Sequence, residues 1–583
     1  MSKQTLKTLG QYGLTIFLSL LILTCVMKLW RAELHVPFAY FGDSLLYSTA
    51  AKGAIENGWW FYNPALGAPA GLHYEAYPAM ENFHLALMKL ISIFTSDHAA
   101  VINLFYLLTF PLTAITALYF FQHFKFSFAP ALAGSLLYTF LPYHFFRSYH
   151  LLMAAYYLVP LMVLAVVWVS FGERLLIYVA ENSRRPRFDL KSPTALFSVV
   201  VCVLVGACGV YYPYFFCFLL LVAGIAASFN NRRVSPLLTA VFLIALVAGS
   251  IVVNHLPTIK YQSEHGRTAM GTRSVVDAEV MGTKITQLLL PIGGHRVEKL
   301  GALKYRYNLG PLVNENDTAS LGFVGSIGFL VLIVALFYRR MPPLIERLSY
   351  LNIAAFLLAT IGGFGVLFAL IVSPQIRAYN RISVFIAFFS LIVVVYLLDA
   401  LGKRLATWPQ RVFFCVCLAV IVAAGVLDQT TTTFFFVPEY DKIAREYKSD
   451  AEFVSRIESS LRAGSMVFQL PYMQFPESPS VHQMIDHEHL KAYLHSKKLR
   501  WSYGVAAGEN QDVWQRTVAA QPVNELVKSV RGAGFAGIYL NRDGFEDHGA
   551  KIESELTAFL GTQPIVSEQG NLVFFHLGGP FVY

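Results

Sequence analysis

The sequence predicts a polytopic α-helical membrane protein that ends in a soluble α/β domain. Three observations support this fold class. The chain has 583 residues, of which 56% are hydrophobic and 14% are charged. A soluble domain carries about 25% charged residues, so this much apolar surface needs lipid as its solvent. Long apolar runs recur as far as residue 428, and beyond that point charges, turns and short apolar runs take over.

The apolar runs are long enough to be membrane helices, which need about 20 residues each. We expect about eleven spans, at 12–30, 99–122, 127–143, 151–171, 194–210, 212–229, 236–255, 319–338, 348–372, 382–400 and 411–428. The first run is too long for the core of a cleaved signal peptide, so we interpret it as a membrane anchor. The short segment 82–94 is interpreted as a helix lying at the membrane interface, because a span there would break the later alternation of loops.

The loops between the spans differ in charge. One set is short and basic, with Lys3, Lys7, Lys125, Arg184, Arg185, Arg187, Lys191, Arg232, Arg233, Arg339, Arg340, Arg347, Lys403, Arg404 and Arg411. Alternation puts this set on one side, which the positive-inside rule makes cytoplasmic. The N-terminus is then cytoplasmic in a multi-pass protein of a bacterial-type inner membrane. The large loops 31–98 and 256–318 and the C-terminal part lie on the outer, periplasmic side.

The C-terminal part, residues 429–583, reads as a separate domain after a transmembrane domain at 1–428. Short apolar runs at 465–470, 537–540 and 572–576 predict strands, and helical patterns occupy 450–461, 523–532 and 550–560. Alternating strands and helices over about 150 residues are typical of a small α/β domain.

Several classes of protein are disfavoured. The six cysteines all lie in apolar runs, so neither a disulfide framework nor a thiolate metal site is indicated. The chain has no G-x-x-x-x-G-K-[ST] phosphate loop and no G-x-S-x-G motif, which disfavours an ATP-driven pump and an α/β-hydrolase. The net charge of +9 is accounted for by the basic loops, so no nucleic-acid partner is expected.

Asp43 is the first candidate for chemistry. It lies about a dozen residues beyond the first span, in the segment Phe41-Gly42-Asp43-Ser44. A carboxylate in apolar surroundings near the membrane surface is expected to have a raised pKa, which suits a general base. The alternative is a helix N-cap, because residues 44–57 look helical. Spacing alone favours the cap.

Further polar residues stand in the outer loops. His73 and Glu75 share the first loop with Asp43, where they either join it around a substrate or are solvated. The turn Tyr143–His150 contains Arg147 and His150. Arginine matches phosphate oxygens with a planar fork of donors, although snorkelling at the interface is the alternative.

Arg377 and Arg381 are more informative, because the positive-inside rule disfavours arginines on the outer side. Residues four apart share a face of a short helix, so an anionic ligand at the outer interface would explain both.

The remaining candidates are weaker. Tyr211 and Tyr212 either line a cavity or belong to the aromatic belt. The loop 256–318 and its flanks contribute His255, His265 and Glu279, without the H-E-x-x-H spacing of a zinc site. In the C-terminal part, His482, Asp486, His487, Glu488 and His489 form a cluster that could bind metal, but a hydrated helix surface is the favoured interpretation.

Taken together, these features resemble the GT-C superfamily of membrane glycosyltransferases, in particular a bacterial branch with YfhO-like members. The shared features are an acidic residue soon after the first span, a large first outer loop and many spans. The Tyr-His-x-x-Arg-x-x-His turn at 143–150, the Tyr-Tyr-Pro turn at 211–213, the Arg-x-x-x-Arg turn at 377–381 and an outer C-terminal domain complete the set. The resemblance covers about three quarters of the chain, and its motifs are loose.

The resemblance implies an enzyme that moves a sugar from a polyprenyl-phosphate donor to a glycan, lipid or protein acceptor of the cell envelope, with inversion. Asp43 matches the catalytic carboxylate of the family. Arg377 and Arg381 would bind the donor phosphate, with Arg147 and His150 as weaker candidates. His73, Glu75, Tyr211, Tyr212, His255, His265 and Glu279 would contact substrate.

One departure concerns metal. Relatives often carry an acidic pair where this chain has Asp43-Ser44. No metal is therefore assigned, and a divalent cation is left open.

Three other functions are alternatives to this one. A transporter or flippase for a lipid-linked glycan would have ionisable residues in mid-span and broken helices. A non-catalytic subunit of envelope polysaccharide assembly would tolerate Asp43→Asn. A phosphoglycerol-type or phosphoethanolamine-type transferase would need a sulfatase-like metal-ligand set, which the C-terminal part lacks.

Overall fold

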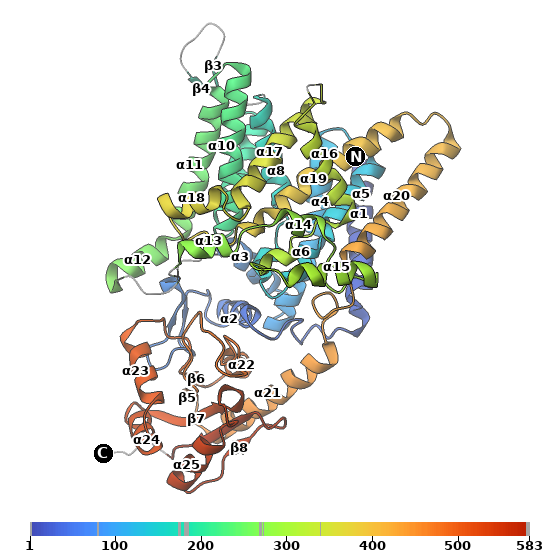
Figure 1. Cartoon of the computed structure of the whole chain (residues 1–583). Coiled ribbons are helices and arrows are strands. Elements are labelled where there is room, and N and C mark those ends of the chain that lie inside the picture. The colour runs from blue at the N-terminus through green and yellow to red at the C-terminus, as the bar shows by residue number, and fades with distance from the viewer. Residues whose placement is uncertain are drawn as a thin grey trace.

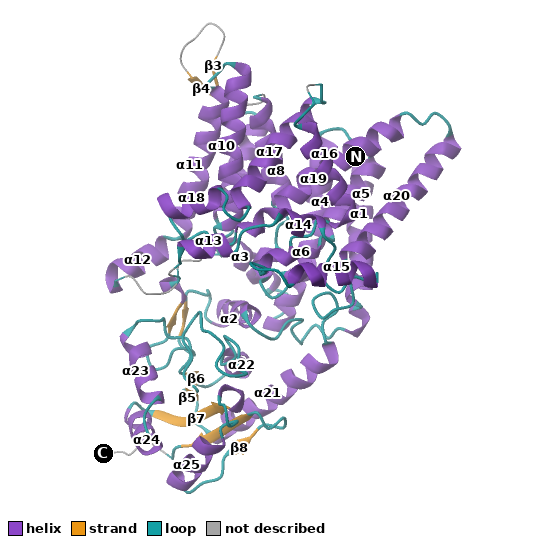
Figure 2. Cartoon of the chain, viewed as in Figure 1, coloured by secondary structure: helices purple, strands orange, loops and turns teal. Residues whose placement is uncertain are grey.

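The computed structural model describes residues 3–77, 81–172, 176–179, 186–189, 191–266, 271, 273–338 and 340–578. Figure 1 shows a helical body above and a smaller C-terminal body below, with helix α2 (Asp43–Glu56) between them. Helices make up almost all of the upper body, and the main sheet lies in the lower one (Figure 2). Arg184, Arg185 and Arg339, from the predicted basic loops, lie outside the described residues.

The upper body is a bundle of apolar helices. Among the described residues, six helices are long and apolar enough to cross a membrane: α1 (Lys3–Met27), α4 (His98–His123), α10 (Tyr211–Asn231), α11 (Ser235–Asn254), the segment Tyr379–Lys403 that contains α19 (Ser383–Lys403), and α20 (Trp408–Gln429). Shorter helices fill the other predicted spans: α5 (Phe128–Thr139), α8 (Val159–Phe171), α9 (Pro193–Gly206), α16 (Gly322–Ala335) and α17 (Pro343–Ala359). The chain is therefore a multi-pass membrane protein, and eleven crossings remain a prediction.

One predicted span is wrong in the structure. The run 348–372 is not a single helix, because α17 ends at Ala359 and α18 (Phe364–Ile371) begins after a break. Gly362 has φ +70° in the break, a conformation that costs glycine little. Thr283 from the large outer loop then pairs with the freed backbone, donating to Ala359 and accepting from Ile361. Apolar composition predicted the burial of this run but could not show the turn within it.

The outer ends of the spans carry short helices. These are α2, α3 (Asn82–Ile91), α6 (Pro142–Phe146), α7 (Leu151–Ala154), α12 (Leu256–His265), α13 (Val275–Val280), α14 (Ile285–Leu289) and α15 (Glu298–Asn308). Helix α3 coincides with the helix predicted at 82–94. Two residue pairs in the first loop form the hairpin of β1 (Tyr62–Asn63) and β2 (Leu72–His73), and a second hairpin joins β3 (Ile177–Val179) to β4 (Pro186–Phe188).

The lower body is built on a five-stranded sheet with the order β6-β5-β7-β9-β8. Its strands are β5 (Met466–Leu470), β6 (Arg500–Trp501), β7 (Phe535–Asn541), β8 (Ile565–Val566) and β9 (Leu572–His576); β5 is parallel to β6 and β7, and β9 is antiparallel to β7 and β8. Around it lie α21 (Tyr440–Ser460), α22 (Leu490–His495), α23 (Asn510–Ala519), α24 (Val523–Gly532) and α25 (Ala550–Leu560). The three predicted strands and the helices at 523–532 and 550–560 are confirmed, whereas the helix predicted at 450–461 begins ten residues earlier.

The first outer loop is built into this sheet. The backbone of Trp501 in β6 donates to Ala65 and accepts from Ala68, at 2.8 and 2.9 Å. Ala68 is fully buried in the same apolar cluster as Phe468 and Val527. The loop covers the β6 edge, which would otherwise expose unpaired backbone groups. The two bodies therefore share a hydrogen-bonded boundary, at which the candidate site lies.

Candidate active site at the boundary of the two bodies

Asp43 opens helix α2 but does not cap it. Gly42 is the N-cap residue, at φ +53°, and no side-chain cap hydrogen bond is made. The interpretation of Asp43 as an N-cap is therefore wrong. Its Oδ2 atom lies 3.1 Å from Nε2 of His150, and its Oδ1 atom lies 3.6 Å from Nε2 of His487. The carboxylate is thus held between the membrane body and the C-terminal body.

The expected raised pKa of Asp43 is also reversed. Burial alone would raise the pKa of the carboxyl, but the hydrogen bonds to His150 and His487 hold it well below its usual range. Burial lowers the pKa of His150 below its ordinary value, although Asp43 opposes that shift. At neutral pH the site therefore holds an ionised carboxylate beside a neutral imidazole, an arrangement that can orient a hydroxyl, although the lowered pKa makes the carboxylate a weaker base than the sequence predicted.

A chain of ion pairs leads away from Asp43 on the membrane side. Arg147 is buried, with Nη1 at 3.4 Å from Nδ1 of His150 and Nη2 at 3.0 Å from the Glu315 carboxylate. Arg381 reaches the same carboxylate, at 3.2 Å. The Arg381 guanidinium also lies over the Tyr211 ring, 4.3 Å from its centroid. Asp43, His150, Arg147, Glu315 and Arg381 thus form one connected network.

Glu315 is the residue at the centre of this network, and sequence reasoning missed it. It begins the 3-10 helix η3 (Glu315–Thr318), and the Asn316 amide fixes that turn by donating to the carbonyls of Gly282 and Leu312. Burial would raise the pKa of Glu315, but Arg381 and Arg147 hold it well below its usual range. One carboxylate between two guanidiniums leaves a net positive charge, which suits an anionic ligand.

The sequence favoured a hydrated helix surface for the cluster around His487 in the C-terminal body, and this interpretation is wrong. His487 and His489 are 2% and 1% exposed, and Lys491 is inserted among acidic residues. His487 has φ +67°, and its Nδ1 atom lies 3.5 Å from the Tyr503 hydroxyl. Ligand atoms of Asp43, Asp486 and His487 all lie within 4.8 Å of one another. Two carboxylates and an imidazole are donors that divalent metals such as Mn²⁺ or Zn²⁺ accept.

Arg377 stands beside the network rather than in it. It is half-buried and, with Arg273, lowers the pKa of Glu477 against the effect of burial. Arg273 makes a two-pronged ion pair with that carboxylate. The Asp43 charge acts in the other direction and raises the pKa of Glu477. Of the two predicted phosphate-binding arginines, Arg381 is therefore the one that the structure joins to Asp43.

The other predicted substrate residues lie in separate settings. His73 pairs with Glu75 at 3.2 Å, and its ring packs on Tyr261, which stacks on His265. The Tyr212 hydroxyl donates to the Met153 carbonyl. The His255 ring lies 2.9 Å from the Ile251 carbonyl at the end of α11. Glu279 accepts from the Gly362 backbone at the break between α17 and α18.

Comparison with known proteins identifies solved structures with a similar fold. No protein-family model matches the chain, and no curated protein matches it either. Among solved structures, apo ArnT from Cupriavidus metallidurans has a TM-score of 0.52 at 12% identity, over 98% of this chain and 98% of that chain. ArnT from the same organism bound to undecaprenyl phosphate has a TM-score of 0.49 at 12% identity, over the same shares. The oligosaccharyltransferase AglB from Archaeoglobus fulgidus, in complex with an inhibitory peptide and a dolichol-phosphate, has a TM-score of 0.46 at 12% identity, over 97% of this chain and 74% of that chain.

The apo ArnT match spans both bodies of the molecule. It includes the membrane helices, the outer loops and the C-terminal sheet, so the site described above lies within the matched region. Over nearly its whole length, the chain has the fold of the GT-C membrane glycosyltransferases.

Proposed function

We propose that the protein is a glycosyltransferase that uses a polyprenyl-phosphate sugar at the outer face of a bacterial cytoplasmic membrane. One observation carries the proposal: the network that connects Asp43 through His150 to two arginines sharing one carboxylate. It joins a proton acceptor to an anion site at the outer ends of the spans. A transfer from a lipid phosphate needs a proton acceptor for the attacking hydroxyl on one side of the anomeric carbon and cations for the leaving phosphate on the other side.

The anion end would bind the donor. The phosphate of the lipid would lie against Arg381 and Arg147, because charge-assisted bonds from guanidinium to phosphate are strong and two-pronged. Negative charge on the leaving phosphate increases in the transition state, and pre-placed cations stabilise it there. The Tyr211 ring would hold the Arg381 guanidinium in place from its other face.

The other end would activate the acceptor. An acceptor hydroxyl would donate its hydrogen bond to Asp43 while its oxygen attacks the anomeric carbon from the side opposite the phosphate. The new carbon–oxygen bond forms as the bond to phosphate oxygen breaks, the proton passes to Asp43, and the sugar is transferred with inversion. His150 and His487 keep the carboxylate ionised and oriented for this step.

The Asp43 end of the site also has side chains that are suitable ligands for a cation. Asp43, Asp486 and His487 would hold a divalent metal, which when bound would make the acceptor hydroxyl more acidic. The C-terminal body would then supply two of the three ligands. With or without a metal, the C-terminal body supplies the His487 contact to Asp43.

The test is donor turnover by purified protein in lipid nanodiscs. A panel of polyprenyl-phosphate sugars is supplied, and released polyprenyl phosphate is measured. We expect turnover by the wild type and its loss in Asp43→Asn and Arg381→Ala. The matched controls are Asp441→Asn, whose exposed carboxylate pairs with the exposed Arg31, and Arg404→Ala, at the opposite end of α19 from Arg381. Both controls should retain turnover.

The alternatives give different results. A flippase would move the lipid-linked sugar across proteoliposomes without releasing polyprenyl phosphate. A scaffold would do neither and would tolerate Asp43→Asn. Failure to bind any polyprenyl phosphate would refute the proposal.

A further inference from the structure

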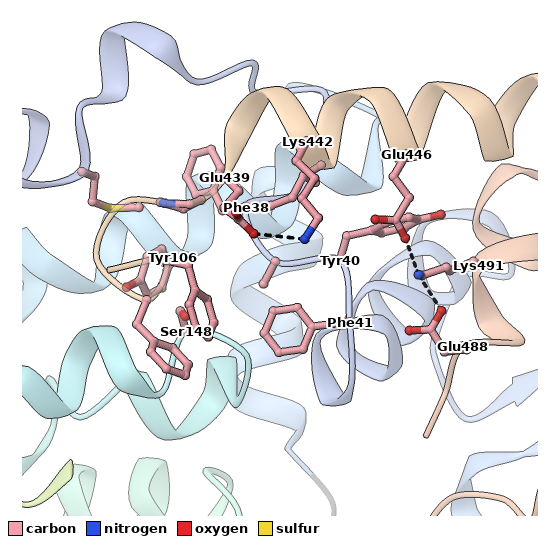
Figure 3. Close-up of a pocket in the computed structure, with 16 residues that line it drawn as sticks. Phe38, Tyr40, Phe41, Tyr106, Ser148, Glu439, Lys442, Glu446, Glu488 and Lys491 are labelled. Atoms are coloured by element: carbon pink, nitrogen blue, oxygen red, sulfur yellow. Dashed lines mark hydrogen bonds and ion pairs between the residues drawn. The ribbon is translucent and has the colours of Figure 1, made fainter. Parts of the chain in front are cut away.

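A cavity lies beside the segment that carries Asp43, and neither Arg147 nor Arg381 lines it. It encloses about 480 Å³, within the range of small-molecule sites. Its walls come from the segment before α2, from the turn that contains Ser148, and from α21 with the linker before it (Figure 3). Phe41 and Ser148 line it, each two residues from Asp43 and His150 respectively. We call it the head pocket.

The head pocket combines aromatic rings with paired charges. Phe38, Tyr40, Phe41 and Phe435 supply the rings. Lys491 is fixed between Glu446 and Glu488, at 2.6 and 2.5 Å. Glu439 and Lys442 form a further pair at 3.3 Å (Figure 3).

These groups select against an anion. Three glutamates and two lysines line the cavity, so its charge is −1 when all five are ionised. That sign repels a phosphate and differs from the arginine end of the site. Aromatic faces with carboxylate acceptors instead suit a saccharide, whose C–H faces are apolar and whose hydroxyl groups are donors.

A separate apolar groove is lined by residues that neighbour the head pocket in the chain. It encloses about 700 Å³ between α1, α5 and α20, and is lined by side chains such as Leu18, Leu132 and Val422. Cys25 and Val26 line the groove, and the next residue, Met27, lines the head pocket. Just beyond α20, Thr430 lines the groove, and Phe434, four residues further along the chain, lines the head pocket. Residues that line the two cavities therefore lie close together in the chain at the ends of α1 and α20.

A cation stands near this end of α20. Arg296 lines the groove, and its Nε atom donates to the Thr430 carbonyl at 3.2 Å. The groove thus runs from an apolar interior to a polar outer end, as the hydrocarbon and linkage regions of an amphiphile would require.

We propose that the acceptor is a lipid-anchored saccharide, with its sugar in the head pocket and its hydrocarbon in the groove. The role of this lipid as the acceptor rests on the proposed function, whereas its binding to the head pocket and the groove does not. The donor chain is not assigned to the groove, because its phosphate belongs with Arg147 and Arg381, which line neither cavity. A soluble glycan has no hydrocarbon chain, so it would bind in the head pocket without filling the groove.

Photocrosslinking tests the site directly. The full-length protein in nanodiscs is given a monohexosyl diacylglycerol with a diazirine in its acyl chain, and labelled peptides are mapped by mass spectrometry. We expect labels on α1 and α20. Excess unlabelled monohexosyl diacylglycerol should remove them, and diacylglycerol without the sugar should not.

A pair of variants locates the chain. Val422→Trp fills the groove and should lower labelling at least tenfold, while Val420→Trp, on the lipid-exposed face of α20, should label as the wild type does. Both should bind polyprenyl phosphate normally. Equal labelling of the two variants, or equal competition by the sugar-free lipid, would overturn the proposal.

Two readouts separate this proposal from the proposed function. Loss of polyprenyl-phosphate binding in Val422→Trp would assign the groove to the donor and refute the acceptor site. Sugar-dependent labelling in a protein that turns over no donor would retain the site while refuting the transferase.

Discussion

Asp43 makes its contacts through side-chain oxygens that asparagine would largely preserve in shape. Asp43→Asn should therefore fold normally but lose the proton acceptor. We expect kcat to fall by about 10²–10⁴, the usual contribution of a general acid or base. Donor binding, measured separately with polyprenyl phosphate, should be unchanged because the arginines remain. A parallel loss of donor binding would show that Asp43 acts through the anion site instead.

Glu315 holds two guanidiniums that would otherwise repel each other. Glu315→Gln leaves Arg147 and Arg381 without their shared counter-charge, and removing one partner of a buried pair costs about 3–5 kcal/mol. An anionic ligand should restore what the carboxylate supplied. We expect the variant to have a lower Tm than the wild type and to gain more Tm from added polyprenyl phosphate. Equal gains in both proteins would place the phosphate elsewhere.

The candidate site was predictable only in part at this scale. Asp43 was found from its apolar segment after the first span, Arg147 and His150 from a polar turn between two spans, and Arg381 because the positive-inside rule disfavours arginines on the outer side. Glu315 was not singled out, and Asp486 and His487 were interpreted as a hydrated surface. Their partners lie tens to hundreds of residues away in the chain, so no local pattern marks them. The low pKa of Asp43 also depends on those distant histidines.

Helix α21 carries a titrating group between the two bodies. Asp450 is buried, accepts from the Tyr40 hydroxyl at 2.9 Å and faces Glu446, Glu488 and Lys491. Burial raises its pKa from 3.8 to about 7, against the effect of Lys491. The folded protein therefore binds one more proton than the unfolded chain between these values. The resulting stability is complete below pH 4 and is lost as the pH rises through 7.

Asp450→Asn should remove this dependence, because the amide imitates the protonated acid. The Tm of the variant should match the wild type near pH 4 and exceed it at pH 8, by an amount that corresponds to at most about 4 kcal/mol. Asp441→Asn, on the exposed face of the same helix, should show no such divergence. Thermal unfolding at several pH values measures both. A constant difference between Asp450→Asn and wild type would contradict the assigned pKa.

Elements were predicted best where one local pattern decides them. The strands at 465–470 and 572–576 are short apolar runs between turns, and the structure pairs both in the sheet. The run 348–372 failed because its break depends on Thr283, a residue from another loop. The start of α21 at Tyr440 was missed because half of its first ten residues are charged, and because the Tyr440 hydroxyl bonds to the end of α1, a contact that no local pattern shows.

The whole molecule constrains its own topology. The first outer loop pairs with β6, and Asp43 meets His487, so the first loop and the C-terminal body lie on the same side of the membrane. The chain between His98 and Gln429 must therefore cross the membrane an even number of times. Ten of the eleven predicted spans fall in this part of the chain, which satisfies the requirement if the broken run 348–372 counts as one crossing, and the basic loops predict that the shared side is the outer one.

Cysteine labelling tests this arrangement. In a protein whose native cysteines are replaced, Glu555→Cys on the exposed face of α25 should react with a membrane-impermeant maleimide in intact cells. Arg404→Cys, in the loop between α19 and α20, should react only after the membrane is permeabilised. The opposite pattern would invert the protein and remove the proposed site from the outer face. Equal reactivity of both positions in intact cells would contradict a membrane crossing by α20, and with it the lipid-facing groove that α1 and α20 form.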